Sequence, residues 1–254
     1  MARKVRQPPR KPFPIVGIGA SAGGLESFRQ MLAALPVDTG MGFVFVQHLD
    51  PTHESRLTEL LSRSTRLPVI EVANRMAVKP NHVYVIPPDR SLAISDGVLK
   101  LTPRNRLRGP NMPIDAFLHS LATERGTLAI GVILSGTATD GAEGLKAIKV
   151  EGGITFAQDE SSAKYIGMPR AAIATGAVDF MLPPAAIARE LGRISRHPYV
   201  NHLPPGPGAE GEEEGGGDLA RIFLEAALNR GEVVECRDHY VRNRSLGNAQ
   251  TSGD

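Results

Sequence analysis

The distribution of hydrophobic and polar residues predicts alternating strands and helices over most of the chain. Short runs that are almost wholly apolar recur at 14–19, 40–47, 69–73, 82–88, 127–136, 152–157 and 177–182. Apolar residues at helical spacing occupy 23–35, 52–64, 113–125, 140–151, 168–176 and 184–195. Uniformly apolar strands that are separated by helices favour a mostly parallel sheet with helices on both faces.

The segment 91–103 follows a different pattern. Its apolar residues are interrupted at the midpoint by Asp96-Gly97, a pair that is typical of a tight turn between antiparallel strands. The expected fold is therefore a doubly wound α/β fold, with a mostly parallel sheet, helices on both faces and a small antiparallel hairpin insertion.

Composition divides the chain into three parts. Residues 1–12 are basic and proline-rich and are expected to be a disordered lead-in, whereas 13–199 carry the strand and helix pattern of one domain. Residues 200–254 begin with an acidic, Gly/Pro-rich stretch and are expected to be a linker followed by a fragmentary tail.

Charge and cysteine content exclude several classes of protein. A net charge of +2 over 254 residues does not argue for nucleic-acid binding, and the single cysteine, Cys236, excludes an internal disulfide framework. No apolar stretch approaches the length of a membrane span, and the one after the basic start is too short for a secretory signal. The expected location is the cytoplasm.

The first candidate for chemistry is a glycine-rich segment between the first predicted strand and the first predicted helix. Around Ser21, the residues 19–23 match Gly-x-Ser-x-Gly, in which small neighbours allow a tight corner that exposes a nucleophilic serine. The same segment also matches a loose dinucleotide fingerprint through Gly17, Gly19 and Gly23. A third interpretation is a tight turn with a serine that caps the helix. On this segment alone, all three interpretations remain open.

His48 favours the interpretation of Ser21 as the nucleophile of a hydrolase over that of a dinucleotide site. A dinucleotide site needs an acidic residue near the end of the second strand, but here that strand runs directly into His48, and Asp50 follows only in the loop. A histidine at the carboxyl end of a neighbouring parallel strand stands at the same sheet edge as Ser21. Its imidazole is suited to take the serine proton and return it to a leaving group.

Asp140 follows the apolar run 127–136 and opens a predicted helix. It is either a cap of that helix or a carboxylate that orients His48 and stabilises its cation. Spacing alone leaves both interpretations open. The other histidines lack partners at metal-ligand spacing, so no metal site is predicted. Arg170 is expected to cap the glycine-rich turn 167–170 at the start of the helix predicted over 168–176, where a structural role and binding of a substrate carboxylate are both open.

Five blocks together resemble a known family. They are IVGIGASAGG (15–24), FVQHLDPTHESRL (45–57), PIDAFLHSLA (113–122), GVILSGTATDGAEGL (131–145) and GMPRAAIATG (167–176). The set is similar to the catalytic domain of the chemotaxis protein-glutamate methylesterases of the CheB type. The resemblance implies hydrolysis of glutamyl methyl esters on cytoplasmic helices of chemoreceptors, and in some members deamidation of receptor glutamines. It implies no metal or organic cofactor and no membrane insertion.

The resemblance also assigns roles. It implies Ser21 as nucleophile, His48 as base and Asp140 as orienting carboxylate, with the backbone amides of Ala22 and Thr137 forming the oxyanion hole. Ala22 and Thr137 stand where the family often has threonine and methionine, but backbone donation survives both changes. Met168 and Arg170 are further candidates, for substrate binding.

Two further expectations concern regulation and relatives. Only about a dozen residues precede the first strand, where the family usually carries a receiver domain. The sequence looks most like the methylesterase module of fused methylesterase–methyltransferase proteins. The segment DLARIFLEA (218–226) is similar to the start of the methyltransferase segment. We therefore expect a truncated or frame-disrupted relative of such a fusion, with a methyltransferase as a separate partner or in a fused relative. The alternative function is a non-catalytic receptor-docking module. Substitution of the predicted triad residues Ser21, His48 or Asp140 would indicate such a module.

Overall fold

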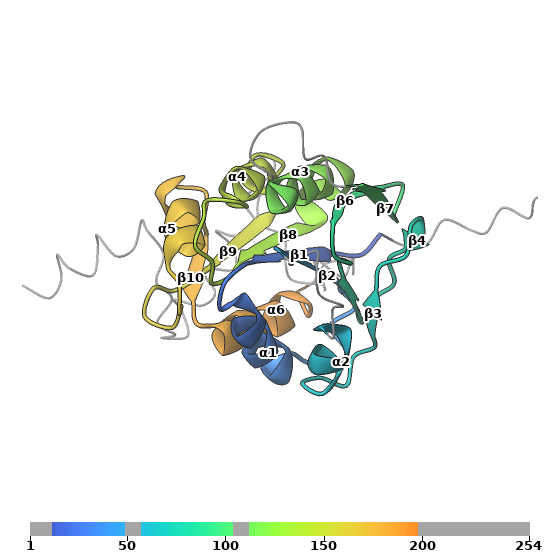
Figure 1. Ribbon diagram of the computed structural model, residues 1–254, viewed down its shortest axis with the longest axis horizontal. Helices are drawn as coiled ribbons and strands as arrows, with labels where there is room; N and C mark the ends of the chain where they lie inside the picture. The colour runs from blue at the N-terminus through green and yellow to red at the C-terminus, as the bar shows by residue number, and fades with distance from the viewer. Residues whose placement is uncertain (1–11, 49–56, 104–111, 198–254) are drawn as a thin grey trace, which may run out of the picture.

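The computed structural model describes residues 12–48, 57–103 and 112–197, and its centre is a parallel sheet (Figure 1). The strands of this sheet are β1 (Ile15–Ala20), β2 (Gly42–Gln47), β3 (Val69–Glu71), β5 (His82–Val85), β8 (Ala129–Ile133), β9 (Ile154–Gln158) and β10 (Phe180–Leu182). The seven strands lie in the order β10-β9-β8-β1-β2-β5-β3, and every pairing between them is parallel. The carboxyl ends of all seven strands therefore share one edge of the sheet.

Helices cover both faces of this sheet, as the sequence predicts (Figure 1). They are α1 (Gly24–Ala34), α2 (Leu57–Ser62), α3 (Pro113–Arg125), α4 (Ala142–Val150), α5 (Gly167–Ala174) and α6 (Pro184–Ile194), with a short 3₁₀ turn, η1, at Gly126–Leu128. One hydrophobic cluster joins the sheet to α1, α2 and α6, and a second joins the other face to α3, α4 and α5. The doubly wound α/β fold is confirmed.

Glycines in β1 allow α3 to pack directly on the middle of the sheet. A Cβ atom at Gly17 would lie 2.6 Å from a Leu118 methyl carbon, and one at Gly19 would lie 2.3 Å from a methyl carbon of Ile114. Any side chain at these positions would push the helix away from the strand. The close approach places the first turn of α3 over the carboxyl end of β1, where Ser21 follows.

The predicted hairpin is present as part of a second sheet. Strands β6 (Arg90–Ser95) and β7 (Val98–Pro103) pair antiparallel, and Asp96 and Gly97 between them have φ angles of 56° and 70°. Positive φ at both central residues is what a two-residue hairpin turn of this kind requires. A short strand that the sequence pattern did not predict, β4 (Met76–Ala77), adds to the outer side of β7.

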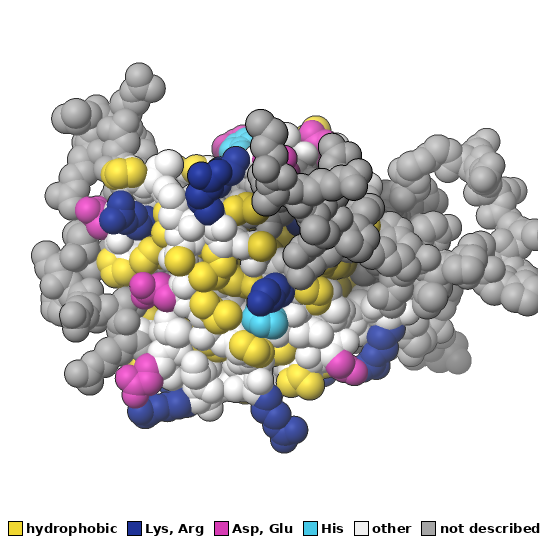
Figure 2. Space-filling model, turned by 90° about the vertical axis from the view of Figure 1, so that its right-hand side faces the viewer, with side chains coloured by type: hydrophobic (Ala, Val, Ile, Leu, Met, Phe, Trp, Pro, Cys, Tyr) yellow, Lys and Arg dark blue, Asp and Glu magenta, His cyan; other side chains and the backbone are white. Residues whose placement is uncertain are grey.

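The side of the molecule that carries β3, β4 and β7 exposes hydrophobic side chains with a few charged ones among them (Figure 2). Ile70, Met76 and Leu101 belong to these strands and are partly buried against the second core cluster. Within the described ranges, none of the helices has both the length and the apolar character to span a membrane. The predicted lead-in, apart from Pro12, and the predicted tail lie outside the described residues, as do 52–56 of the helix expected at 52–64.

Candidate active site

Ser21 directly follows β1 and begins the turn that leads into α1. Its backbone N–H donates to the carbonyl oxygen of Ser135, at 3.0 Å, which ties the turn to the end of β8. Gly23 precedes the helix with φ 73°, in the left-handed region that glycine enters without strain. The glycine-rich segment thus makes the sharp corner that the sequence predicts and leaves the serine at the carboxyl edge of the sheet.

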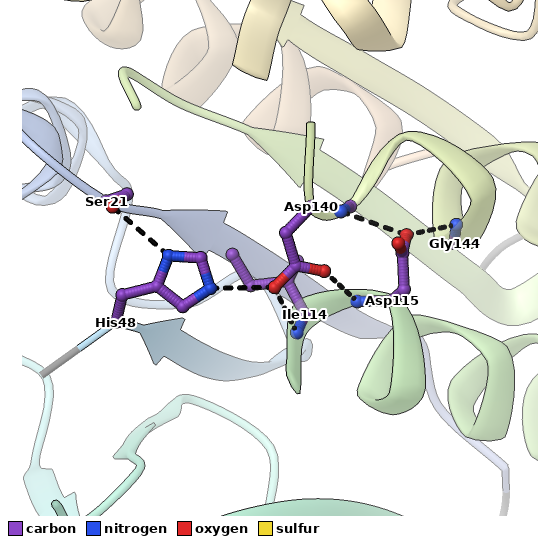
Figure 3. Close-up of polar contacts among 7 residues, drawn as sticks. Ser21, His48, Ile114, Asp115, Asp140 and Gly144 are labelled. Carbon is purple, nitrogen blue, oxygen red and sulfur yellow. Dashed lines mark hydrogen bonds and ion pairs between the residues drawn. The ribbon is translucent and has the colours of Figure 1, made fainter. Parts of the chain in front are cut away.

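His48 directly follows β2 and contacts both other predicted members of the triad (Figure 3). Its Nδ1 lies 3.1 Å from the Ser21 hydroxyl oxygen, and its Nε2 lies 2.8 Å from Oδ2 of Asp140. An ionised carboxylate only accepts hydrogen bonds, so Nε2 carries the hydrogen and Nδ1 is left to accept from the serine hydroxyl. The imidazole side chain is 26% exposed, whereas the Asp140 side chain is fully buried.

The carboxylate of Asp140 is held by the first turn of α3. Its Oδ2 accepts from the backbone N–H of Ile114 at 3.0 Å, and its Oδ1 accepts from that of Asp115 at 2.9 Å. Among the described residues, the Asp140 side chain accepts no amide of α4, the helix that it precedes. The interpretation of Asp140 as a cap of its own helix is therefore wrong, because it caps α3 instead.

The segment of Gly136 and Thr137 runs beside Ser21. A Cβ atom at Gly136 would lie 2.0 Å from the sulfur of Met168 and 3.0 Å from Cβ of Ser21. The N–H of Gly136 donates to the carbonyl of Tyr165 at 3.0 Å, and its carbonyl accepts from the Met168 N–H at 2.9 Å. These contacts fix the segment that ends in Thr137, one of the two predicted oxyanion donors.

The amides of Ala22 and Thr137 have no acceptor among the described residues. Ala22 is half-buried and Thr137 is exposed, on the two segments that border the nucleophile. Two amides without partners beside a serine are suited to receive a developing negative charge. Their role as an oxyanion hole stays a prediction.

The two predicted substrate-binding side chains lie in different environments. Met168 is fully buried behind Gly136. The prediction that Arg170 caps a turn before the helix is wrong, because Arg170 lies within α5, where it is exposed and forms two hydrogen bonds of 2.9 Å with the carboxylate of Glu160. This pairing lowers the pKa of Glu160 and raises the pKa of Arg170. Contact of either side chain with substrate stays a prediction.

This chain is similar to known proteins over most of the residues that form the sheet and its helices. Residues 16–191 match the family model described as CheB methylesterase. The chain belongs to the CheB methylesterase family. It is 37% identical over 191 residues to the protein-glutamate methylesterase FrzG of Myxococcus xanthus, covering 75% of this chain and 57% of that protein. It is 40% identical over 185 residues to a protein-glutamate methylesterase/protein-glutamine glutaminase of Burkholderia lata, covering 72% of this chain and 54% of that protein.

A solved structure agrees as well. The catalytic domain of the Thermotoga maritima CheB methylesterase matches with a TM-score of 0.67 and 30% identity, over 72% of this chain and all of that one. The match of this chain spans a little over half the length of the curated relatives. The match to the family model begins at the second residue of β1 and includes β2 and β8. Ser21 follows β1, His48 follows β2, and the segment that leads to Asp140 follows β8.

Sequence reasoning missed Ser135 and Tyr165 at this CheB site. The buried Ser135 hydroxyl donates to the Ala22 carbonyl at 2.9 Å and accepts from the Tyr165 N–H at 3.0 Å, so it joins the two segments that border Ser21. Tyr165 is 40% exposed, and its ring lies 3.2 Å from where a Cβ of Gly23 would be. No spacing rule connects residues so far apart in sequence. No group of three or more metal-ligating side chains gathers within the described part of the chain.

Proposed function

We propose that this protein is a protein-glutamate methylesterase that uses Ser21, His48 and Asp140 as a catalytic triad. The observation that carries the proposal is the continuous path of hydrogen bonds from the serine hydroxyl through the imidazole to a buried carboxylate (Figure 3). The relatives indicate the ester, since both are named protein-glutamate methylesterases. The expected substrates are methylated cytoplasmic helices of chemoreceptors, which places the protein in the cytoplasm.

The first half of the reaction forms an acyl-enzyme. His48 accepts the Ser21 proton at Nδ1 while the serine oxygen bonds to the carbonyl carbon of the methyl ester. The resulting oxyanion receives hydrogen bonds from the amides of Ala22 and Thr137. The bond to the methoxy oxygen then breaks, and that oxygen takes the proton from His48 and leaves as methanol. Asp140 stabilises the imidazolium during this step.

The second half returns the enzyme to its starting state. A water molecule gives one proton to His48 and attacks the acyl carbon, and the Ser21 oxygen leaves and recovers that proton. The product is a glutamic acid side chain, which releases the second proton of the water to solvent and becomes a carboxylate. The same steps with ammonia in place of methanol deamidate a glutamine, which is the second activity in the name of the Burkholderia lata relative.

A non-catalytic receptor-docking module is the alternative, and the geometry disfavours it. A domain that only docks has no need for a fully buried Asp140 side chain aligned on a histidine and a serine.

The predicted partnership with a methyltransferase, separate or fused, supplies the methyl ester that the reaction consumes.

The test measures methanol released from methylated receptor membranes. We expect Ser21→Ala to lower kcat by about 10⁶-fold and His48→Ala by a similar factor, because the two residues act as one unit. Ser62→Ala is the matched control, since its exposed hydroxyl donates to the Thr58 carbonyl on α2, and it should keep full activity. Full methanol release by folded Ser21→Ala protein would refute the proposal.

A further inference from the structure

Behind Asp140, helices α3 and α4 begin side by side, and each needs an acceptor for the free amides of its first turn. The residues that precede the helices, Met112 and Gly141, provide no side-chain cap. The caps come instead from the opposite helix. Asp140 accepts the amides of α3, and Oδ1 of Asp115 accepts the N–H of Gly141 at 2.9 Å and of Gly144 at 2.7 Å (Figure 3).

Asp115 consequently holds Asp140 at two points. The Asp115 backbone N–H donates to the carboxylate of Asp140, and the Asp115 carboxylate binds the N–H of Gly141, which belongs to the peptide that follows Asp140 in the chain. This peptide is also confined on its other side. Gly141 has φ 98°, and a Cβ there would lie 2.3 Å from a methyl carbon of Ile133. The backbone of Asp140 thus has little freedom to turn.

We propose that Asp115 is a positioning residue of the esterase, which keeps the Asp140 carboxylate aligned on His48 by capping α4 while Asp140 caps α3. The inference rests on the triad of the proposed function. Among the described residues, no hydrogen bond joins Asp115 to Ser21 or His48, so it acts through Asp140. A displacement of a catalytic group by about 1 Å costs about 10²-fold in rate, which sets the scale of the expected effect.

The chemistry of the cap needs an acceptor oxygen rather than a charge. Oδ1 of Asp115 binds the two amides, and an oxygen that carries no proton accepts them whether or not Oδ2 is protonated. Burial, with the negative charge of Asp140 nearby, raises the pKa of the Asp115 carboxyl, against the lowering effect of its hydrogen bonds and of His119. An asparagine at 115 presents the same carbonyl oxygen, so it should preserve the alignment that an alanine loses.

The experiment compares Asp115→Asn and Asp115→Ala with wild type by two readouts. The first is kcat and KM for methanol release, and the second is the rate at which a fluorophosphonate probe labels Ser21, which needs no receptor. Asp179→Ala is the matched control. It also removes a largely buried carboxylate that accepts a backbone N–H, from Thr155, but at the opposite edge of the sheet. Thermal unfolding of every variant shows that it is folded at the assay temperature.

We expect Asp115→Ala to lower kcat and the labelling rate by about 10²-fold with KM unchanged, and Asp115→Asn to recover most of both. Asp179→Ala should label at the wild-type rate. If Asp115→Ala does not fold, Asp115→Ser replaces it, because its single shorter hydroxyl cannot bind both amides. Wild-type labelling by folded Asp115→Ala or Asp115→Ser, or a loss in Asp115→Asn as large as in alanine, overturns the inference. Labelling of Ser21→Ala at the wild-type rate would instead refute the triad itself.

Discussion

Two aspartates lie at opposite edges of the central sheet and receive similar hydrogen bonds; Asp140 is buried, and 11% of the Asp179 side chain is exposed. Asp140, at the carboxyl edge, binds His48 and two backbone amides of α3. Asp179, directly before β10 at the amino edge, binds Lys149 Nζ at 2.8 Å, together with the N–H and the hydroxyl of Thr155 at 2.9 and 2.8 Å. The two carboxylates differ mainly in which side chain faces them.

This difference is the one we expect between a structural carboxylate, Asp179, and the catalytic carboxylate that we propose, Asp140. Lys149 comes from the last turn of α4, and its amine is protonated at neutral pH, so the ion pair at Asp179 is already complete. Burial nevertheless raises the pKa of Asp179, and the hydrogen bond from Lys149 opposes this effect. Asp140 instead faces the imidazole of His48, which in the proposed mechanism takes the proton of Ser21 and so becomes positively charged during the reaction. In the proposed mechanism, Asp140 assists the reaction because the charge of its partner changes, whereas the partner of Asp179 is charged from the start.

The topology of the sheet determines which helix ends surround each aspartate. In a parallel α/β sheet, the helices that follow the strands begin at the carboxyl edge and end at the amino edge. Free helix N–H groups and the positive ends of the helix dipoles therefore surround Asp140, and the end of a helix with its basic residue lies beside Asp179. Within the described part of the chain, helix amides and His48 hold Asp140, with no ion pair to lysine or arginine.

The largest expected effect comes from Asp140→Asn. An asparagine has one carbonyl oxygen in place of two carboxylate oxygens, and its NH₂ group favours the wrong tautomer of His48. We expect kcat for methanol release to fall by about 10⁴-fold while the protein stays folded. Kinetics and circular dichroism measure the two quantities. Activity within about tenfold of wild type would remove the distinction between the two aspartates.

Asp179→Ala should have the opposite profile. The change leaves the N–H of Thr155 and the amine of Lys149 without this acceptor, and we expect a loss of about 1–3 kcal/mol in the free energy of unfolding. The catalytic constants of the folded fraction should not change, because the site lies at the other edge of the sheet. Urea unfolding and kinetics check both, with Asp179→Asn as the control that keeps an acceptor oxygen. A fall in kcat without a fall in stability would contradict this assignment.

The parts of the site that follow from strand order could be predicted from sequence. Ser21 and His48 each follow an apolar strand, and parallel strands end at one edge, so their proximity follows from the fold class. Helix α3 occupies the predicted range, Pro113–Arg125, because its apolar spacing and initial proline are local signals.

The capping exchange between α3 and α4 could not be predicted. Asp140 and Asp115 each bind amides from another helix, 25 to 29 residues away in the chain, and such bonds depend on how the helices pack. A local rule instead assigns Asp140 to the helix that it precedes. Strand β4 has only two residues, too few for any periodicity, and it forms because β7 offers an edge.

The smallest expected effect concerns a third carboxylate, Glu160. Its partner, Arg170, is permanently charged like a structural partner but exposed, so Glu160 differs from Asp179 mainly in burial. The hydrogen bonds from Arg170 lower the pKa of Glu160, whereas burial raises the pKa of Asp179. A lowered pKa in the folded state means that the pair stabilises the fold above the unfolded pKa, and that this contribution is lost as the pH falls through the folded value.

We therefore expect Glu160→Gln to lower the melting temperature slightly near neutral pH, with the difference from wild type vanishing in acid. The effect is small because both side chains are about half exposed, and solvent screens such pairs.

Asp179→Asn should show the reverse trend. The raised pKa makes ionised Asp179 a cost that grows as the pH rises, so the asparagine variant should gain relative to wild type toward neutral pH. Melting curves of both variants and wild type, from about pH 3 to pH 7, measure the two slopes. Slopes of the same sign would show that burial does not distinguish these carboxylates.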